Sequence, residues 1–466
     1  MENKYIRLIK DIGIFALGTL GSKLIIFLLL PLYTHVLSTE EYGISDLIFT
    51  LSQLILPFVS LAIFNGLLRY GLMKENRPED ALGCASRVFV FGSIAAVLLT
   101  PILKFIPSIG QWRWFLCACI VSSFAVSNAL VYLKVKDKNK LYAIMSIAQT
   151  FVLVLSNIVL LVVMQLGIKG YLMAYIISNA VTALLAFVFG GMMQDLKVSK
   201  YNSTLMKAMI LFSLPYVLND VSWWAINSSN KLIIEFVLLD SAILGIFTTA
   251  SKIPSLLNVV TNIFVQAWGL SSIREFDSSN DAGFYSKIFN AFIIVLVAMC
   301  IAIISVIKIF MGIYVSAEFF ESWKYVPLLL IAALFSAVSG FFGSLLGAMK
   351  KSQNLMWTTL AAGVANVVVN LVFIKIFDIW GAVIGTIVAY VVVALCRLIS
   401  VKRYINIKLD TLKLCLLLAV CFAQAVLVSM DVNILLTSFV AVIAFVAIVF
   451  KDVVGLYNSF VKRKGV

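Results

Sequence analysis

The sequence is poor in charged residues and in the groups that catalytic or metal sites use. Only 12% of its 466 residues are charged, it has one histidine, and none of its seven cysteines forms a CxxC pair. It contains no Walker loop, no cluster of His, Cys and carboxylate residues, and no paired carboxylates beside a base. ATP hydrolysis, metal catalysis and acid–base catalysis therefore have no residues to carry them. We expect a protein that is not an enzyme and that needs no metal or organic cofactor.

Hydrophobic residues, in contrast, make up 62% of the chain, and the mean hydropathy is +1.06. Apolar runs of about 20 residues recur along the whole length, and a helix of that length crosses a bilayer. We therefore predict an all-α polytopic membrane protein of about 14 transmembrane helices. The predicted spans are 11–36, 43–68, 84–105, 112–133, 141–166, 171–193, 207–237, 242–268, 286–310, 324–347, 355–377, 381–400, 411–429 and 433–451.

The net charge is +14, and the Lys and Arg residues that produce it are distributed as the predicted membrane topology requires. Of the 36 Lys and Arg residues, 27 lie in the termini or in alternate loops of one side, six lie on the other side, and three fall within apolar segments. By the positive-inside rule, both termini are predicted to be cytoplasmic. The basic surplus is thus a topology signal, and no nucleic-acid partner is expected.

The two halves of the sequence resemble each other. Residues 36–44 and 237–246 share a Val-Leu pair followed by Gly-Ile, and residues 156–159 resemble 369–372. Six predicted helices separate the copies, so both copies have the same orientation and an axis along the membrane normal should relate them. The predicted organisation is an N-lobe of helices 1 to 6 (1–193), a cytoplasmic inter-lobe loop (194–206), a C-lobe of helices 7 to 12 (207–400), extra helices 13 and 14 (411–451) and a cytoplasmic tail (452–466).

Polar side chains line one face of two of these apolar helices. Asp220, Trp224, Asn227, Lys231 and Glu235 follow steps of four and three residues, which places them on one face of predicted helix 7. Polar stripes inside apolar helices indicate a water-filled cavity between helices. The next helix carries a second stripe with similar spacing, which consists of Thr248, Lys252, Ser255, Asn262 and Gln266.

The repeat extends this cavity to the first half of the chain. Subtracting 202 from the second stripe gives a polar face on predicted helix 2 that includes Asp46, Thr50 and Gln53. Subtracting 201 from Trp224 gives Lys23 in helix 1. Helices 1, 2, 7 and 8 are therefore the predicted walls of a central cavity. The candidate substrate-binding residues are Lys23, Lys231, Lys252, Asp220, Trp224, Asn227, Gln53, Asn262 and Gln266.

The charged candidates allow more than one role. A Lys or Asp at the bilayer centre costs about 2.5 to 3.5 kcal/mol, so each needs water, a partner or a function. Lys23 and Lys252 are expected to face the translocation path, although Lys23 could also pair with Asp220, and Lys231 with the acid one turn further on. Asp220 is the candidate for coupling to a proton or a sodium ion. Arg69, at the inner end of helix 2, either receives a phosphate from the cytoplasm or is a snorkelling anchor.

Three segments resemble the bacterial polysaccharide flippases, of the O-antigen and capsule type, within the multidrug/oligosaccharidyl-lipid/polysaccharide exporter superfamily. They are PLYTHVLSTEEYG at 31–43, NSSNKLII at 227–234 and GIFTTASK at 245–252. The sequence departs from the family where the family often has Asp-Arg, here Asn230-Lys231, and where it often has Tyr, here Phe247.

The resemblance implies two six-helix lobes that rock about a central cavity in alternating access. It also implies a substrate, an oligosaccharide repeat unit on undecaprenyl pyrophosphate, which is moved from the cytoplasmic to the outer leaflet. The implied location is the bacterial cytoplasmic (inner) membrane, with membrane lipids and the polysaccharide polymerase machinery as partners, and a monomer is expected. Lysines can attract the pyrophosphate, and amides can hydrogen-bond the sugars.

Other functions stay open at this point. A multidrug or cation antiporter of the same superfamily should present acids to its substrates, which Asp46 and Asp220 allow and Lys23 opposes. A lipid II flippase is weakened by the lack of an arginine-rich pattern in helix 1. A membrane glycosyl polymerase or ligase needs a large external loop with catalytic residues, and the predicted external loops are too short.

Overall fold

The computed structural model describes residues 12–13, 27–106, 108–278, 282–405, 407 and 410–464. The elements formed by these residues are helical, and none of them is a strand. Besides the α-helices, these residues form three short 3₁₀ helices, Ile102–Phe105, Gly110–Trp112 and Ala317–Lys324. They also form one π-helical segment, Ile158–Val163. The α-helices are α2 (Leu30–Val36), α3 (Thr39–Ser60), α4 (Ile63–Gly71), α5 (Pro78–Leu99), α6 (Arg113–Val135), α7 (Asn139–Asn157), α8 (Gly167–Gly190), α9 (Met192–Val198), α10 (Ser203–Leu238), α11 (Ser241–Ser278), α12 (Ala282–Tyr314), α13 (Val326–Ala348), α14 (Ser352–Phe377), α15 (Ile379–Lys402), α16 (Thr411–Ser429) and α17 (Ile434–Lys464).

Twelve helices are long and apolar enough to cross a membrane, counted over the described residues. They correspond to the predicted spans from 43–68 through 411–429, which confirms the all-α polytopic fold. The first predicted span, 11–36, lies largely outside the described residues, which include α2 at its end. The last predicted span, 433–451, coincides with the apolar part of α17, Ile434–Phe450.

The second predicted span, 43–68, is two helices and not one. α3 begins earlier than predicted because Ser38 and Glu41 form a capping box, in which each backbone N–H donates to the other side chain at 3.1 Å. α3 ends at Ser60, because Leu61 and Ala62 take left-handed backbone conformations with φ of 50° and 48°. Residues with a Cβ rarely adopt this conformation, so the chain is strained between α3 and α4.

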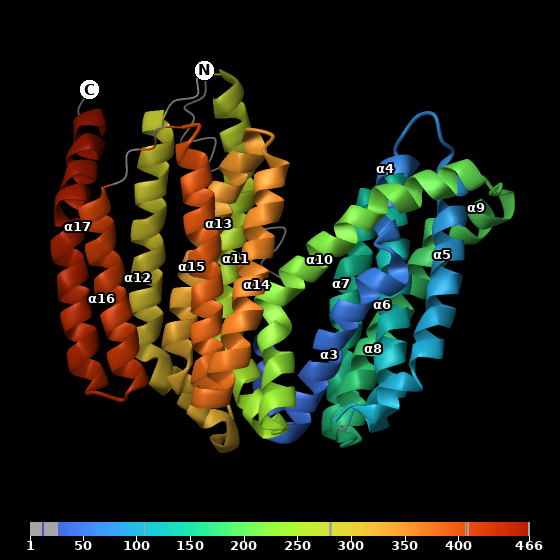
Figure 1. The fold of residues 1–466 in the computed structure, drawn as a ribbon, viewed down its shortest axis with the longest axis horizontal. Helices are drawn as coiled ribbons and strands as arrows, with labels where there is room; N and C mark the ends of the chain where they lie inside the picture. Colours follow the sequence, from blue (N-terminus) through green and yellow to red (C-terminus); the bar gives the residue numbers. More distant parts are fainter. Residues whose placement is uncertain are drawn as a thin grey trace. The chain divides into compact units, whose positions relative to one another are not determined.

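The described residues divide into two compact units, Leu24–Gly245 and a unit that includes Ile246–Val466. The first unit contains α2 to α10 and the first turn of α11, and the second contains the rest of α11 and α12 to α17. Within the first unit, α10 packs against α3 and α4 (Figure 1). α10 begins the C-lobe expected from the repeat, and the lobe boundaries drawn from the sequence stay a prediction.

α10 is a helix of 36 residues that changes direction along its length in Figure 1. It contains Pro215, which has no N–H to continue the helical hydrogen bonds and so permits a bend. Next to this proline, α10 lies very close to α4. The Gly66 N–H of α4 donates to Ser213 Oγ of α10 at 3.0 Å. A Cβ added at Gly66 would lie 2.9 Å from the Met209 carbonyl oxygen. This contact directs the second half of α10 along α3.

A buried arginine joins three helices of the second unit. Arg397 of α15 is 4% exposed and donates to the Ser339 carbonyl oxygen of α13 and to Thr359 Oγ1 of α14, each at 3.0 Å. A buried charge needs such hydrogen bonds, so Arg397 holds α13, α14 and α15 together. The extra C-terminal helices are attached in a similar way, since Gln424 of α16 donates to Ser305 Oγ of α12 at 3.0 Å.

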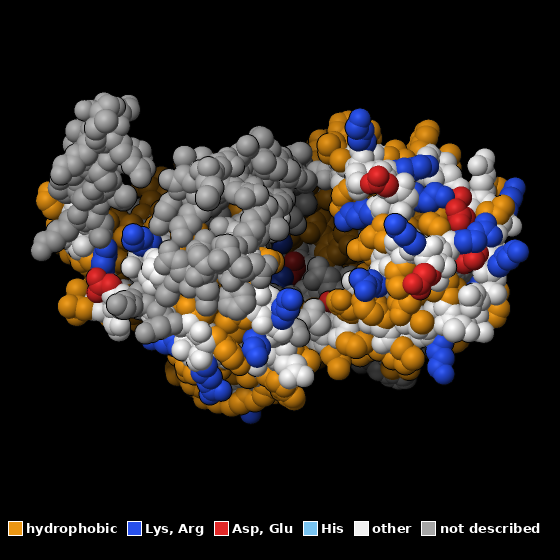
Figure 2. All heavy atoms as spheres, turned by 90° about the horizontal axis from the view of Figure 1, so that it is seen from above, with side chains coloured by type: hydrophobic (Ala, Val, Ile, Leu, Met, Phe, Trp, Pro, Cys, Tyr) orange, Lys and Arg blue, Asp and Glu red, His pale blue; other side chains and the backbone are white. Residues whose placement is uncertain are grey.

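Lys and Arg side chains gather, with acids between them, on the face of the first unit where α4 ends and α5 begins (Figure 2). Lys136 on this face bridges two acids, with its Nζ 2.9 Å from Glu79 Oε1 and 3.4 Å from Asp195 Oδ2. Burial alone would lower the pKa of Lys136, but the hydrogen bond with Glu79 and the charge of Asp195 raise that pKa above its ordinary value. The bridge ties α5, α9 and the end of α6 together. That this face is cytoplasmic stays a prediction.

Candidate functional site

An ion pair joins α3 to α10 inside the first unit. Lys231 Nζ of α10 lies 2.6 Å from Asp46 Oδ2 of α3, and the two side chains are 16% and 8% exposed. Lys231 thus pairs across the helix interface and not with Glu235 on its own helix, because the packing of α10 along α3 brings Asp46 opposite it. Removing one member of such a largely buried pair is destabilising, so the pair helps to fix α10 on α3.

Trp224, two turns before Lys231, makes a second contact between the same helices. Its indole Nε1–H donates to the Thr50 carbonyl oxygen of α3 at 2.8 Å, and the side chain is half-buried. This bond turns the polar edge of the indole toward α3. Stacking of the ring on a sugar stays a prediction.

Replacing Trp224 by Phe should lower the free energy of unfolding by about 1 kcal/mol, because most of the ring stays while one partly buried hydrogen bond is lost. Denaturant unfolding of the protein in detergent would measure this change. Trp114→Phe is the matched control, since Trp114 is 57% exposed, and its free energy of unfolding should stay within about 0.5 kcal/mol of the wild type. Equal losses in the two variants would contradict a role for the Trp224 N–H.

The remaining predicted residues of α3 and α10 are more exposed. Gln53 and Asn227 are exposed, and Asn227 Nδ2 donates to a carbonyl oxygen of its own helix at 2.7 Å. Asp220 is half-buried, and its Oδ1 accepts from Asn219 Nδ2 at 3.5 Å. Lys23 lies outside the described residues, so its pairing with Asp220 stays a hypothesis.

The predicted residues of α11 beyond its first turn belong to the second unit. Lys252 is half-buried, and its carbonyl oxygen accepts the Ser255 O–H at 2.6 Å. Asn262 and Gln266 are exposed further along the helix. Their convergence with Lys231 in one cavity stays a prediction. Arg69 is exposed in the last turn of α4, where both of its predicted roles stay open.

The glycines of the repeated motif pack against each other's helices. A Cβ added at Gly43 of α3 would overlap the Ser241 carbonyl oxygen and would lie 2.9 Å from Gly245 N. A Cβ added at Gly245 of α11 would overlap the Thr39 carbonyl oxygen and would lie 2.8 Å from the Thr39 carbonyl carbon. The first turns of α3 and α11 therefore cross with their backbones in contact, which glycine permits. The two copies of the motif are neighbours in space.

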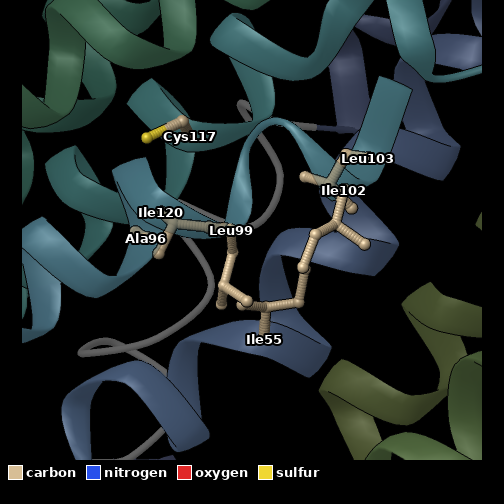
Figure 3. Close-up of a pocket in the computed structure, with 7 residues that line it drawn as sticks. All are labelled: Ile55, Ala96, Leu99, Ile102, Leu103, Cys117 and Ile120. Atoms are coloured by element: carbon tan, nitrogen blue, oxygen red, sulfur yellow. The ribbon is translucent and has the colours of Figure 1, made fainter. Parts of the chain in front are cut away.

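An apolar cavity of about 240 Å³ lies between α3, α5 and α6 in the first unit (Figure 3). Its lining has no charged side chain, so it is suited to hydrocarbon and not to a phosphate or a sugar. The residues that line it are Ile55, Ala96, Leu99, Ile102, Leu103, Cys117 and Ile120.

Sequence reasoning missed one part of the first unit, the environment of Glu235. The stripe on α10 groups Glu235 with Lys231, but the structure buries the Glu235 side chain, 2% exposed, against Ser108 and Ser241. Ser108 precedes α6 and is 127 residues away in sequence. No periodicity connects two residues so far apart, so the sequence carries no signal for this contact.

No family model and no curated protein matches this sequence. Solved structures do resemble it. The lipid II flippase MurJ, in an inward closed conformation, aligns with a TM-score of 0.68 at 12% identity, over 95% of this chain and 99% of that one. An inward-facing multidrug resistance MATE transporter of the MOP superfamily aligns with a TM-score of 0.63 at 13% identity, over 82% of this chain and 95% of that one. The Vibrio cholerae MATE transporter VcmN aligns with a TM-score of 0.53 at 13% identity, over 86% of this chain and 98% of that one. The chain therefore has the polytopic membrane fold that these flippase and transporter structures share.

Proposed function

We propose that this protein is a flippase for undecaprenyl-pyrophosphate-linked oligosaccharide repeat units. It moves them from the cytoplasmic to the outer leaflet of the bacterial cytoplasmic membrane by alternating access through a central cavity. The observation that carries the proposal is the pair of membrane-spanning helices α3 and α10, which hold Lys231 and Asp46 with Trp224 nearby. Ionised groups within apolar helices are costly, and a path for a polar, charged cargo accounts for them.

Each part of the proposed cargo has a matching chemical group. Lys231 and Lys252 carry compact positive charges that can attract a pyrophosphate. Gln53 and Asn227 expose amides that can hydrogen-bond sugar hydroxyls. The lipid tail can stay in the bilayer against the apolar outer faces of the helices. In this proposal the protein works as a monomer among membrane lipids and supplies a polysaccharide polymerase.

A lipid II flippase is the second candidate function, because the MurJ structure aligns over 95% of this chain with a TM-score of 0.68. Complementation separates the two candidates. We expect the gene to restore surface polysaccharide to a strain that lacks its polysaccharide flippase, and not to restore growth to a strain depleted of its lipid II flippase. A multidrug antiporter is the third candidate, and the half-buried Asp220 is an acid that could face a cationic drug.

Replacing Lys252 or Lys23 by Ala should abolish surface polysaccharide while the protein still inserts in the membrane, because each change removes a charge that attracts the pyrophosphate. Polysaccharide staining in the complemented strain and an immunoblot of its membrane fraction would measure the two effects. Lys140→Ala is the matched control, since Lys140 is exposed in the first turn of α7, and it should leave polysaccharide levels unchanged. Normal polysaccharide in both the Lys23 and Lys252 variants would contradict the anion-binding cavity.

A further inference from the structure

A polar cavity of about 460 Å³ lies within the first unit, where α3 and α11 begin and α10 ends. It is separate from the Lys231–Asp46 pair and from the apolar cavity of Figure 3. Its lining contains acids, hydroxyls and an amide but no Lys, Arg or His. The residues that line it are Glu40, Ile44, Ser108, Gln111, Glu235, Leu239, Asp240, Ser241 and Ala242.

The positions of two of the three lining acids, Glu40 and Asp240, are explained by the N-terminal ends of the helices at which they lie. Asp240 is exposed and accepts the backbone N–H groups of Ala242 and Ile243 at 2.9 and 3.2 Å, as an acid at the start of α11 should. Glu40 is exposed in the first turn of α3, where the helix dipole favours a negative charge. Neither side chain needs a ligand to account for its position.

Glu235 is different, because its carboxylate is buried in the wall of the cavity and only 2% of the residue is exposed. Ser241 Oγ lies 3.0 and 2.9 Å from its two oxygens, and Ser108 Oγ also donates to Oε1. Across the described residues no Lys, Arg or His lies within ion-pair distance of it. Two hydroxyls are neutral partners, so they leave the charge of a buried carboxylate uncompensated.

We propose that Glu235 binds a small monovalent metal cation in this cavity, with the hydroxyl oxygens of Ser108 and Ser241 and the amide oxygen of Gln111 as further ligands. Carboxylate, hydroxyl and amide oxygens are hard ligands of the kind that alkali and alkaline-earth ions take. In the part of the chain that the structure describes, no three His, Cys, Asp or Glu side chains converge as a metal-binding group. One buried carboxylate balances a single positive charge, which favours Na⁺ over a divalent ion.

The position of the cavity gives such an ion a structural consequence. Ser241, which donates to Glu235, also presents its carbonyl oxygen to Gly43 at the crossing of α3 and α11. A cation held by Glu235 and Ser241 would therefore fix the turn from α10 to α11 at that crossing. This inference does not depend on which substrate the protein carries.

The test is the thermal unfolding of the purified full-length protein in detergent, at constant pH and ionic strength, with choline chloride replaced stepwise by NaCl. We expect a saturable rise in Tm, and at a sodium concentration 100 times Kd the unfolding equilibrium constant should fall about 100-fold. Glu235→Gln keeps the size and the acceptor oxygen of the side chain but removes its charge, so this variant should lose the sodium-dependent rise. Glu321→Gln is the matched control in an exposed acid of the second unit, and it should keep the rise.

Ser108→Ala and Ser241→Ala keep the test decisive if Glu235→Gln does not fold, because each removes one neutral ligand. Each should raise the sodium concentration at half-saturation by about tenfold, the equivalent of about 1.4 kcal/mol. A wild-type Tm that responds to pH but to no metal cation would make Glu235 a proton site and overturn the proposal. A sodium response that Asp220→Asn loses and Glu235→Gln keeps would overturn it too, since the ion would then belong to Asp220.

Discussion

Substituting Gly245 by Ala is expected to lower the stability of the protein by about 3 kcal/mol, at the upper end of the range for an overpacked site, and to abolish transport. The added Cβ would overlap the Thr39 carbonyl oxygen. A backbone oxygen cannot rotate away as a side chain can, so the first turns of α3 and α11 would have to separate. Denaturant unfolding in detergent measures the first effect, and surface polysaccharide in the complemented strain measures the second.

Gly43→Ala should have the same effect, because its Cβ would meet the Ser241 carbonyl oxygen at the same crossing. The double variant should lose less than the two single variants together, since the helices separate only once. Gly347→Ala is the control: this helical glycine of α13 has nothing within 4 Å of an added Cβ. It should keep transport and gain about 0.5 to 1 kcal/mol from its higher helix propensity. If Gly43→Ala and Gly245→Ala both have the free energy of unfolding of the wild type, the first turns of α3 and α11 are not in backbone contact.

The transmembrane helices could be predicted from the sequence because the constraint on them is one-dimensional. A span needs about 20 consecutive apolar residues, and the chain shows such runs directly. The earlier start of α3 was also readable, since Ser38 and Glu41 have the spacing of a capping box. The break at Leu61 and Ala62 was not, because nothing in those two residue types favours a left-handed backbone.

The candidate site could be predicted only up to the faces of its helices. Steps of four and three residues placed Lys231 and Trp224 on one side of α10, and the repeat brought Asp46 and Thr50 into the same set. Which acid pairs with Lys231 depends on how far α10 slides along α3, and a periodic pattern does not contain that distance. The hydrogen bond between Ser108 and Glu235 could not be predicted, because Ser108 lies in a loop whose sequence has no periodic pattern.

The Asp46–Lys231 pair allows stability and transport to be separated in one set of variants. Asp46→Asn and Lys231→Met should each lower the free energy of unfolding by about 3 to 5 kcal/mol, because each removes one member of a largely buried ion pair. The double variant contains neither charge, so it should recover most of the lost stability. Unfolding in denaturant gives the coupling energy of the cycle. The exposed pair of Lys324 and Glu321 is the control, and its coupling energy should be about 0.5 kcal/mol or less.

Transport by the same double variant then decides what Lys231 does. If Lys231 attracts the pyrophosphate of the cargo, Lys231→Met and the double variant should both fail to produce surface polysaccharide, although the double variant is stable. If the pair only holds α10 on α3, transport should return together with stability. We expect the first result. Apolar side chains of similar volume could replace a buried ion pair without loss of stability, so packing alone does not explain why α3 and α10 carry these two charges. A stable, fully active double variant would remove Lys231 from the substrate path and leave Lys252 and Lys23 to bind the anion.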